Sequence, residues 1–412
     1  MRILTFSAYY TPEIVSSMYL TEDIYKALVS NGHEIMLFCP IPCRGVSKET
    51  RKKYKKLRKE EKYDGKLHIR RFFLFKEHKS TFLRFIRYYF LTWIFFFKGL
   101  FVKADVIFAQ STPPIIGLAL SKLRFWKRIP VVYNLQDIFP DSLVNAGITK
   151  KGSLIWKIGR CIEKKTYKSA KHIIVISEDF ENNIITKGIS KNKITLIPNW
   201  VDGDEVLYVE REKNKLFDLY NLDRHKFYVA YSGNIGYTQD LDMLLDAALI
   251  LQSKNKEVGF ILVGEGAAKE HVLKRISDEK INNVAMIPFQ DYRDISFVFS
   301  LGDVGLIISK KGIGENSVPS KTWSYMAASR PILASFDLNS QLSLTIKKAG
   351  CGLISEAGNI DDFVEKVLWF SSHRDSLEKM GRSGREFVVT ELDKKRCSDL
   401  YCRTIENATK KE

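Results

Sequence analysis

The stretch Tyr228–Gly236 reads YVAYSGNIG, and it decides the fold class. A short apolar run suited to a buried strand is followed by a serine and two glycines, and a helical pattern begins near Asp240. Strand, glycine loop and helix in this order are typical of a parallel α/β sheet. Glycine lets the backbone approach a ligand closely, and amides at a helix N-terminus favour a phosphate. A plain turn after the strand is the alternative.

The same alternation of strand and helix extends in both directions from this stretch. The strand-like runs are Ile3–Phe6, Glu34–Phe38, Leu67–Phe73, Val106–Ala109, Val131–Tyr133 and Ile173–Ile176 before it, and Phe260–Val263, Val284–Ile287, Val304–Ile308 and Ile332–Ala334 after it. Amphipathic segments such as Tyr19–Val29 separate them. Alternation of this kind predicts an α/β protein with two doubly wound parallel sheets in tandem.

The length of 412 residues fits two or three domains. The alternation of strand and helix stops over Asn199–Lys226, where charged residues are frequent, and we expect the linker there. The expected divisions are residues 1–200 for an N-terminal domain and 201–385 for a C-terminal domain. Residues 386–412 form a final helix that packs back on the first domain in this interpretation.

The chain carries a formal charge of +17, from 65 Lys and Arg against 48 Asp and Glu. A surplus of this size indicates an anionic partner: nucleic acid, phospholipid or a phosphorylated substrate. The excess is concentrated in the segment Arg44–Lys62. That segment has few aromatic residues for base stacking and no zinc or helix-turn-helix pattern, which argues against nucleic acid. We expect a mobile, solvated loop over Arg44–Glu61, and a phosphate-binding arm is the alternative.

The six cysteines form no Cys-x-x-Cys pair and no alternating framework, so we expect reduced thiols in a cytosolic protein. Residues Met1–Pro12 lack a basic leader and a long apolar run, and we interpret them as a first strand rather than a signal peptide. Neither pattern indicates export.

The stretch Phe82–Val102 is the longest apolar one, but three cations interrupt it, and about 20 uninterrupted residues are needed to cross a bilayer. On a helix, Arg84, Arg87 and Lys98 lie on one side. The opposite side then carries Ile86, Tyr89, Trp93, Phe96, Phe97 and Leu100. Such a helix is typical of a membrane interface. A helix packed into a domain core is an equally good explanation.

Two further loops follow strands in the second half. Val263-Gly264-Glu265-Gly266 carries a carboxylate that suits ribose or sugar hydroxyls. The loop Gly312–Lys321 precedes an expected helix, Thr322–Ala328, with Pro319 and Ser320 as first-turn and cap residues. A lysine in the first turn opposes the helix dipole, so Lys321 is interpreted as a contact to a diphosphate. An exposed lysine without a role is the alternative.

Together these motifs resemble a known family. Gly233–Gly236, Val263–Gly266, Ile197–Asp202 and the run from Pro319 through Ala328 to Pro331 look like retaining glycosyltransferases of family 4. That family has the GT-B architecture, in which two Rossmann-like domains face a cleft. Two motifs of the first half, Gln110–Pro114 and Gln136–Ser142, are similar to the branch that builds lipid-linked O-antigen and capsule repeats, including N-acetyl-L-fucosamine transferases.

The resemblance implies transfer of a sugar, in this branch an N-acetylated deoxy sugar, from a UDP-linked donor to a lipid-linked saccharide. The C-terminal domain would bind the donor and the N-terminal domain the acceptor. Asp137 stands where many members carry a histidine near the reacting sugar, and Ser16 and Ser17 stand where a glycine pair approaches the diphosphate. The implied donor contacts are Ser16, Ser17, Gly233, Asn234, Gly236, Gln239, Gly264, Glu265, Phe289 (to the base), Gly314, Asn316, Ser317 and Ser324.

The sequence departs from the family pattern at the ribose and diphosphate positions. The usual pair of glutamates reads Asn316 and Ser324, so Glu265 or Glu315 would have to replace the ribose-binding carboxylate. The usual arginine reads Asn234, which leaves Lys321 as the main cation at the diphosphate. The catalytic candidates are therefore Asp137, Lys321 and Glu315.

The chemistry expected is stabilisation of the departing diphosphate by backbone amides and Lys321. No Asp-x-Asp signature lies where a donor-bound cation would be expected, so we expect neither a metal requirement nor a cofactor. With retention, a phosphate oxygen takes the acceptor proton, and Asp137 positions groups or stabilises charge. The expected location is the inner face of the cytoplasmic membrane, on an anionic surface.

Two other classes of function remain open at this point. A nucleotide-sugar 2-epimerase can share the scaffold, and it would convert the donor without an acceptor. A non-catalytic polyanion-binding protein would account for the charge of +17 and for the missing glutamates, and its affinity would depend on salt.

Overall fold

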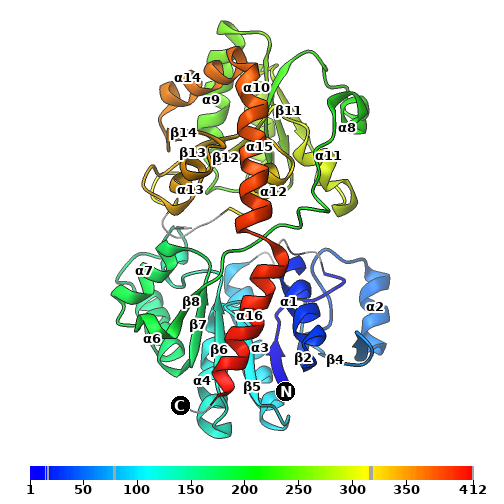
Figure 1. The fold of residues 1–412 in the computed structure, drawn as a ribbon, viewed down its shortest axis with the longest axis vertical. Helices are drawn as coiled ribbons and strands as arrows, with labels where there is room; N and C mark the ends of the chain where they lie inside the picture. Colours follow the sequence, from blue (N-terminus) through cyan, green and yellow to red (C-terminus); the bar gives the residue numbers. More distant parts are fainter. Residues whose placement is uncertain (14, 16–17, 78–79, 146, 315–318, 411–412) are drawn as a thin grey trace. The chain divides into compact units, whose positions relative to one another are not determined.

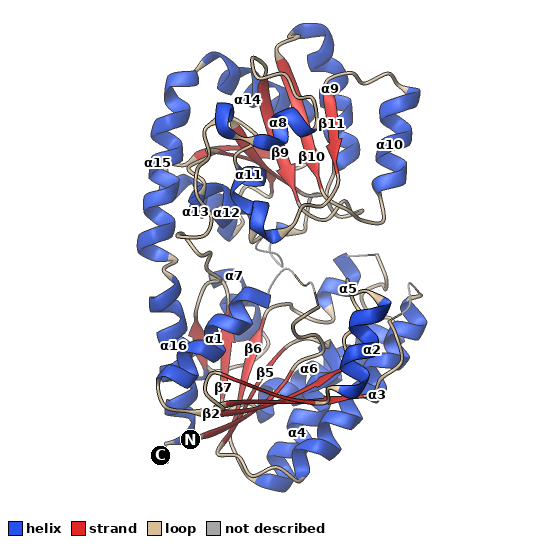
Figure 2. Cartoon of the chain, turned by 90° about the vertical axis from the view of Figure 1, so that its right-hand side faces the viewer, coloured by secondary structure: helices blue, strands red, loops and turns tan. Residues whose placement is uncertain are grey.

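The computed structural model describes residues 1–412 except 14, 16–17, 78–79, 146, 315–318 and 411–412. The chain forms two compact units: Met1–Asn199 together with Lys395–Glu412, and Trp200–Lys394. Each unit holds one sheet with helices on both faces (Figures 1 and 2). The prediction of two doubly wound α/β domains is confirmed.

The first unit is built on a sheet of eight strands in the order β3-β4-β2-β1-β5-β6-β7-β8. Only β3 runs antiparallel to its neighbour within this sheet. The strands are β1 (Arg2–Phe6), β2 (Glu34–Pro40), β3 (Lys59–Lys62), β4 (Leu67–Phe72), β5 (Val106–Gln110), β6 (Val131–Leu135), β7 (His172–Val175) and β8 (Ile194–Leu196). The helices are α1 (Met18–Ser30), α2 (Lys48–Lys56), α3 (Thr81–Leu100), α4 (Gly117–Lys127), α5 (Asp141–Asn145), α6 (Leu154–Ser169), α7 (Glu178–Thr186) and α16 (Lys394–Thr409).

Helix α16 packs on the first unit although it follows the second unit in the chain. The Tyr401 hydroxyl, which is buried, donates to Asn134 Oδ1 on β6 at 3.1 Å. Glu406 Oε1 lies 2.8 Å from His33 Nε2, beside the start of β2. The first unit is therefore completed by the last helix of the chain, which lies against the sheet together with α1 (Figure 1).

The second unit has a six-stranded parallel sheet in the order β11-β10-β9-β12-β13-β14. The strands are β9 (Phe227–Ser232), β10 (Val258–Val263), β11 (Val284–Ile287), β12 (Val304–Ile308), β13 (Ile332–Phe336) and β14 (Gly352–Glu356). The helices are α8 (Lys215–Leu219), α9 (Leu241–Lys254), α10 (Lys269–Asp278), α11 (Ile295–Phe299), α12 (Lys321–Ala327), α13 (Gln341–Ala349), α14 (Ile360–Ser372) and α15 (Arg374–Glu391). The strand order reverses between β9 and β12, and in open α/β sheets ligands bind beyond the carboxyl ends of the strands at such a point.

The strands of the second unit are mostly apolar, and β10 with VGFILV is apolar throughout. A strand covered by helices on both faces buries every side chain, so it shows a continuous apolar run rather than alternation. Helix α9 contributes Leu244, Leu245 and Leu251 to the core on one face. Helix α8 contributes Leu216 and Phe217 to the core on the other.

That packing corrects the linker expected over Asn199–Lys226. The division between the units falls after Asn199, and the residues that follow belong to the second unit. Arg211 donates to the carbonyls of Arg224 and Lys226 at 2.9 and 2.7 Å and forms an ion pair with Asp303 at 2.6 Å. The charged residues of this stretch bind their own domain, and sequence pattern cannot distinguish that from a solvated linker.

The expectation of a mobile loop over Arg44–Glu61 is wrong. The segment forms α2 and then β3 at the edge of the sheet. Ser47 caps α2, since its side chain accepts from the Thr50 N–H at 3.1 Å. Arg51 is buried and donates to the carbonyls of Pro42 and Leu74 at 2.6 and 3.2 Å. One arginine that satisfies loop carbonyls is enough to fix the segment.

Helix α3 forms where the amphipathic stretch was expected, but its cations do not make an outer face. Arg87 is fully buried and donates to the Phe75 carbonyl at 3.1 Å. The Lys98 ammonium lies 5.8 and 5.7 Å from the ring centroids of Phe38 and Phe72. In the part of the chain that the structure describes, no helix is both long and apolar enough to cross a membrane.

Candidate functional site

Two glycines lie side by side beyond the carboxyl ends of β9 and β10. The strands are paired in parallel with Ser232 opposite Val263, so Gly233 and Gly264 are the next residues on each. Their φ angles are +149° and +150°, a conformation that L side chains rarely adopt. A Cβ on Gly264 would overlap the Gly233 carbonyl. Both positions therefore require glycine, and the backbone is left bare at this edge.

Lys321, the first residue of α12, lies against this glycine pair. Its Nζ is 3.7 Å from the centre of the Tyr231 ring and 2.7 Å from where a Cβ on Gly233 would stand. Among the described residues no carboxylate forms an ion pair with it. Burial lowers the pKa of Lys321 to about 7. A half-buried ammonium with no anionic partner among the described residues suits an anionic ligand.

Ser320 stands at the N-cap position expected for α12, but it does not cap the helix through its side chain. The helix begins at Lys321 itself, and Ser320 has helical angles and makes no side-chain capping bond. What holds Lys321 in place is the ring of Tyr231, a residue that the sequence interpretation did not include. A tyrosine two residues before the glycine loop was the available signal, but a strand tyrosine is far more often simply part of the core.

The loop after β9 is held by its own polar side chains. The Tyr231 hydroxyl donates to the Asn234 carbonyl at 2.7 Å, and Gln239 Oε1 accepts from the Gly236 N–H at 3.2 Å. The Asn234 side chain is exposed, and the Lys310 N–H, two residues beyond β12, donates to the Thr238 carbonyl at 3.0 Å. The loops of β9 and β12 are thereby joined where the strand order reverses.

The loop after β12 is anchored by Asp337, which follows β13. Its Oδ1 accepts from the Gly312 N–H at 2.9 Å and its Oδ2 from the Gly314 N–H at 2.7 Å. A Cβ on Gly314 would lie 2.8 Å from that same Oδ2. The sequence interpretation selected Gly314 but missed Asp337. The available signal was an acidic residue directly after a strand that neighbours β12.

The remaining predicted donor residues are spread along the same unit. Glu265 is exposed, with Oε1 2.7 Å from Lys269 Nζ. Phe289 is 61% exposed just beyond β11, and Ser324 is half-buried on α12. The structure thus brings together Gly233, Asn234, Gly236, Gln239, Gly264 and Lys321. The predicted residues Ser16, Ser17, Glu315, Asn316 and Ser317 lie outside the described residues.

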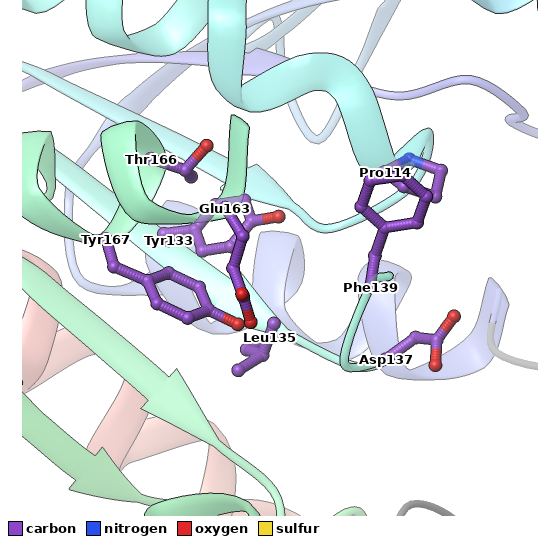
Figure 3. A pocket seen from close by; sticks show the side chains of 8 residues that line it. All are labelled: Pro114, Tyr133, Leu135, Asp137, Phe139, Glu163, Thr166 and Tyr167. Carbon is purple, nitrogen blue, oxygen red and sulfur yellow. The ribbon is translucent and has the colours of Figure 1, made fainter. Parts of the chain in front are cut away.

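Asp137 belongs to the first unit, two residues beyond β6. It lines a pocket enclosing about 210 Å³, part of it open to solvent, at the carboxyl end of that strand (Figure 3). The lining residues are Pro114, Tyr133, Leu135, Asp137, Phe139, Glu163, Thr166 and Tyr167. Burial raises the pKa of Asp137, while hydrogen bonds from the Ser142 side chain and the Ile138 backbone act against that rise.

A second carboxylate of the pocket is already neutralised. Glu163 on α6 is buried and lies 2.8 Å from Lys187 Nζ, and it also pairs with Arg160. Lys187 lies 2.9 Å from Asp141 as well. Of the two acids that line the pocket, Asp137 is therefore the one without an ion pair among the described residues. The described residues contain no group of three His, Cys, Asp or Glu side chains placed to hold a metal ion.

Two protein-family models match the chain in tandem. The model described as Glycosyltransferase Family 4 matches residues 19–205, and the one described as Glycosyl transferases group 1 matches residues 212–387. The chain belongs to glycosyltransferase family 4. The resemblance seen in the glycine motifs is thereby confirmed, and the two matches follow the two units of the fold.

Among curated proteins, the chain is 27% identical over 250 residues to the probable glycosyltransferase WbjE of Pseudomonas aeruginosa. It is 26% identical over 199 residues to the putative colanic acid biosynthesis glycosyl transferase WcaI of Escherichia coli. These matches cover 61% and 48% of this chain. They span 62% and 48% of the relatives' own lengths.

Among solved structures, Alr3699/HepE of Anabaena in complex with UDP and glucose has a TM-score of 0.72 at 14% identity, over 99% of this chain and 100% of that one. Sucrose-phosphate synthase of Thermosynechococcus elongatus has a TM-score of 0.74 at 14% identity, over 98% of each chain. At these identities the likeness concerns the fold alone. It confirms the prediction that the fold is GT-B.

Proposed function

We propose that this protein is a retaining glycosyltransferase that moves a sugar from a nucleoside diphosphate donor to a lipid-linked saccharide in the synthesis of a bacterial surface polysaccharide of the O-antigen or capsule type. The observation that carries the proposal is the bare glycine pair Gly233 and Gly264 with the Lys321 ammonium directly beside it. Membership of family 4 and the curated relatives WbjE and WcaI support the reaction class.

The chemistry follows from charge. Breaking the bond between sugar and diphosphate leaves negative charge on the departing group, and groups already fixed at that place stabilise it without rearrangement. Gly233 and Gly264 let a diphosphate come within reach of backbone amides, and Lys321 supplies the cation. Burial, which lowers the pKa of this lysine, also strengthens its attraction to a bound diphosphate because less water screens it.

The donor is proposed to be UDP-linked and its sugar an N-acetylated deoxy hexose. Support for UDP comes from HepE, which was solved with UDP. Support for the sugar comes from the likeness of Gln136–Ser142 to N-acetyl-L-fucosamine transferases. The exposed ring of Phe289 beyond β11 is assigned to the base, and the loop that Asp337 anchors is assigned to the sugar.

The acceptor is assigned to the first unit, at the pocket of Asp137. With retention, the acceptor hydroxyl approaches the face that the diphosphate leaves, and a phosphate oxygen takes its proton. The carboxylate of Asp137 is assigned to stabilise the positive charge that develops on the sugar. The reaction is proposed to need no metal, because backbone amides and Lys321 neutralise the leaving group. A lipid-linked acceptor would bring the protein to the inner face of the cytoplasmic membrane.

The test begins with thermal shift against UDP-, GDP- and dTDP-sugars, and continues with release of nucleoside diphosphate in the presence of extracted lipid-linked acceptors. Lys321→Ala should lower turnover by about 10²-fold or more. Lys348→Ala, at an exposed lysine on α13, is the matched control and should leave turnover unchanged. Turnover that survives both substitutions alike would remove Lys321 from the site.

The same assay separates the two other classes of function. Donor conversion without any acceptor would indicate an epimerase. Absence of donor binding together with salt-dependent binding of polyanions would indicate a non-catalytic protein.

A further inference from the structure

One face of the first unit exposes an unusual number of large aromatic side chains, which we call the aromatic face. It consists of Phe82, Phe85, Tyr89, Phe90 and Phe97 on α3, Phe101 at its end, and Phe125 and Trp126 on α4. Phe101, Phe125 and Trp126 are 87%, 76% and 68% exposed. Scattered single apolar residues are normal on a surface, but a contiguous patch of this kind marks an interaction site.

The patch is continuous because the two helices pack side by side (Figure 2). Lys127 Nζ donates to the carbonyls of Leu100 and Val102 at 3.1 and 2.7 Å, which fixes the end of α4 to the end of α3. On α3, Trp93 bridges the rings of Tyr89 and Phe97, with centroids 6.3 and 6.2 Å away. The Lys122 ammonium of α4 lies 5.4 Å from the Trp93 ring centroid.

The charges on these helices have a single sign. Helices α3 and α4 carry six Lys and Arg residues and no Asp or Glu, but the three on α3 do not serve the aromatic face: Arg87 is buried, Lys98 lies over two inner rings, and Arg84 pairs with Glu77 at 3.0 Å. The cations available beside the face are on α4, where Lys122 is exposed and Arg124 is half-buried. Beyond their ends, Lys103 and Arg128 are exposed. A second copy of the chain docked symmetrically through this face would set cations against cations. An anionic lipid surface satisfies both features, since it takes aromatic rings at the headgroup level and attracts Lys and Arg.

We propose that the aromatic face is a membrane-docking surface that inserts its rings among the headgroups of anionic lipids. It rests on the proposed function only in that the acceptor is membrane-borne. The basic helix α2 has a different role in this arrangement. Its exposed lysines can attract a charged bilayer, but it offers no aromatic residue for insertion except the half-buried Tyr54. Attachment should therefore depend on α3 and α4, with α2 adding only a salt-sensitive contribution.

The experiment uses vesicles of phosphatidylglycerol mixed with phosphatidylcholine, and vesicles of phosphatidylcholine alone, in co-sedimentation with the full-length protein. Strong binding is expected only with phosphatidylglycerol present. Phe125→Ser with Trp126→Ser should weaken that binding by about tenfold or more. Leu219→Ser, at an exposed apolar residue of the second unit, should leave it unchanged. A blue shift of tryptophan emission on binding should be reduced in Trp126→Phe, which keeps an aromatic ring for attachment.

Three results would contradict membrane docking by the aromatic face. Vesicle binding that the double variant retains in full, or no binding to phosphatidylglycerol at all, overturns the proposal. Self-association that the double variant abolishes would assign the face to a second copy, and it also overturns the proposal. The thermal shift with UDP, measured on the same samples, keeps the two proposals apart. Binding of UDP without binding of vesicles would contradict the membrane-docking surface alone. Binding of vesicles without binding of nucleotide would contradict the proposed function alone.

Discussion

At Lys321 two electrostatic effects oppose each other. Burial lowers its pKa to about 7, whereas a bound diphosphate favours the charged form and raises the pKa again. If only the ammonium pairs with the diphosphate, UDP affinity should fall about tenfold for each pH unit above 7, and binding should take up a proton in that range. Calorimetric titration in buffers of different ionisation enthalpy measures both quantities.

Lys321→Arg is the control for this prediction, because a guanidinium stays charged throughout the range and its variant should lose the pH dependence. Lys321→Ala should also lose the pH dependence of UDP binding, but its affinity for UDP should be lower. Equal pH profiles in all three proteins would mean that another group titrates.

At Asp137 burial shifts the pKa in the opposite direction from that at Lys321. Burial raises the pKa of this carboxyl, so its ionised form is lost at a higher pH than that of an exposed aspartate. If the carboxylate stabilises positive charge on the sugar, turnover should decline on the acid side of its pH profile. Asp137→Asn should lower turnover by about 10²-fold and remove that acid limb. Asp278→Asn, at an exposed carboxylate on α10, should change neither.

At the scale of elements, the loop after β12 depends on one carboxylate for its shape. Asp337 accepts from the N–H groups of Gly312 and Gly314, and an asparagine there would turn an NH2 group toward one of those donors. Asp337→Asn should therefore raise the KM for the donor about tenfold, the loss expected from about one hydrogen bond, with a smaller effect on kcat. Steady-state kinetics against Asp361→Asn, an exposed carboxylate on α14, tests this. Loss of kcat with an unchanged KM would contradict a positioning role.

The elements that the sequence predicted are those with strong apolar patterns. Strands such as β10 and β12 are continuous apolar runs, so their position and their burial follow from composition. Strand β3 reads KEEK, and helix α2 is mostly lysine. These elements are held in place by single contacts, such as that of Arg51 with Pro42. A contact of that kind leaves no periodic pattern in the sequence.

The residues of the candidate site likewise fall into those that the sequence could predict and those that it could not. Gly233 and Gly264 stand in loops directly after recognisable strands, and Lys321 stands at the start of a recognisable helix, so motif and order were enough to select them. Tyr231 and Asp337 act through other residues across the sheet, and their partners lie 90 and 23 positions away in the chain. Pairings at such separations depend on which strands are neighbours. The sequence could not predict, for the same reason, that the aromatic face points outward. That direction follows from the burial of Arg87 on the other side of α3.

At the scale of the whole molecule, the first unit is assembled from two distant segments. Residues 1–199 lack the helix that covers part of their sheet until α16 is added from the end of the chain. Tyr401 on that helix is buried, with its ring 6.1 Å from that of Phe108 and its hydroxyl on Asn134. The second unit is continuous in sequence and has its own cores, so the two units should differ in what stabilises them.

Unfolding should therefore show two transitions that respond to different changes. UDP at about 100 times its Kd should stabilise the second unit by about 2.7 kcal/mol, because Gly233, Gly264 and Lys321 all belong to that unit. Tyr401→Ala should destabilise the first unit alone, by about 3–5 kcal/mol, because it leaves a large cavity and removes one of the two hydrogen bonds that Asn134 Oδ1 accepts. Calorimetry with each change separately, and then with both, tests whether the effects add. A single transition that moves with either change would mean that the units unfold as one body, and the independence inferred from their separate cores would be wrong.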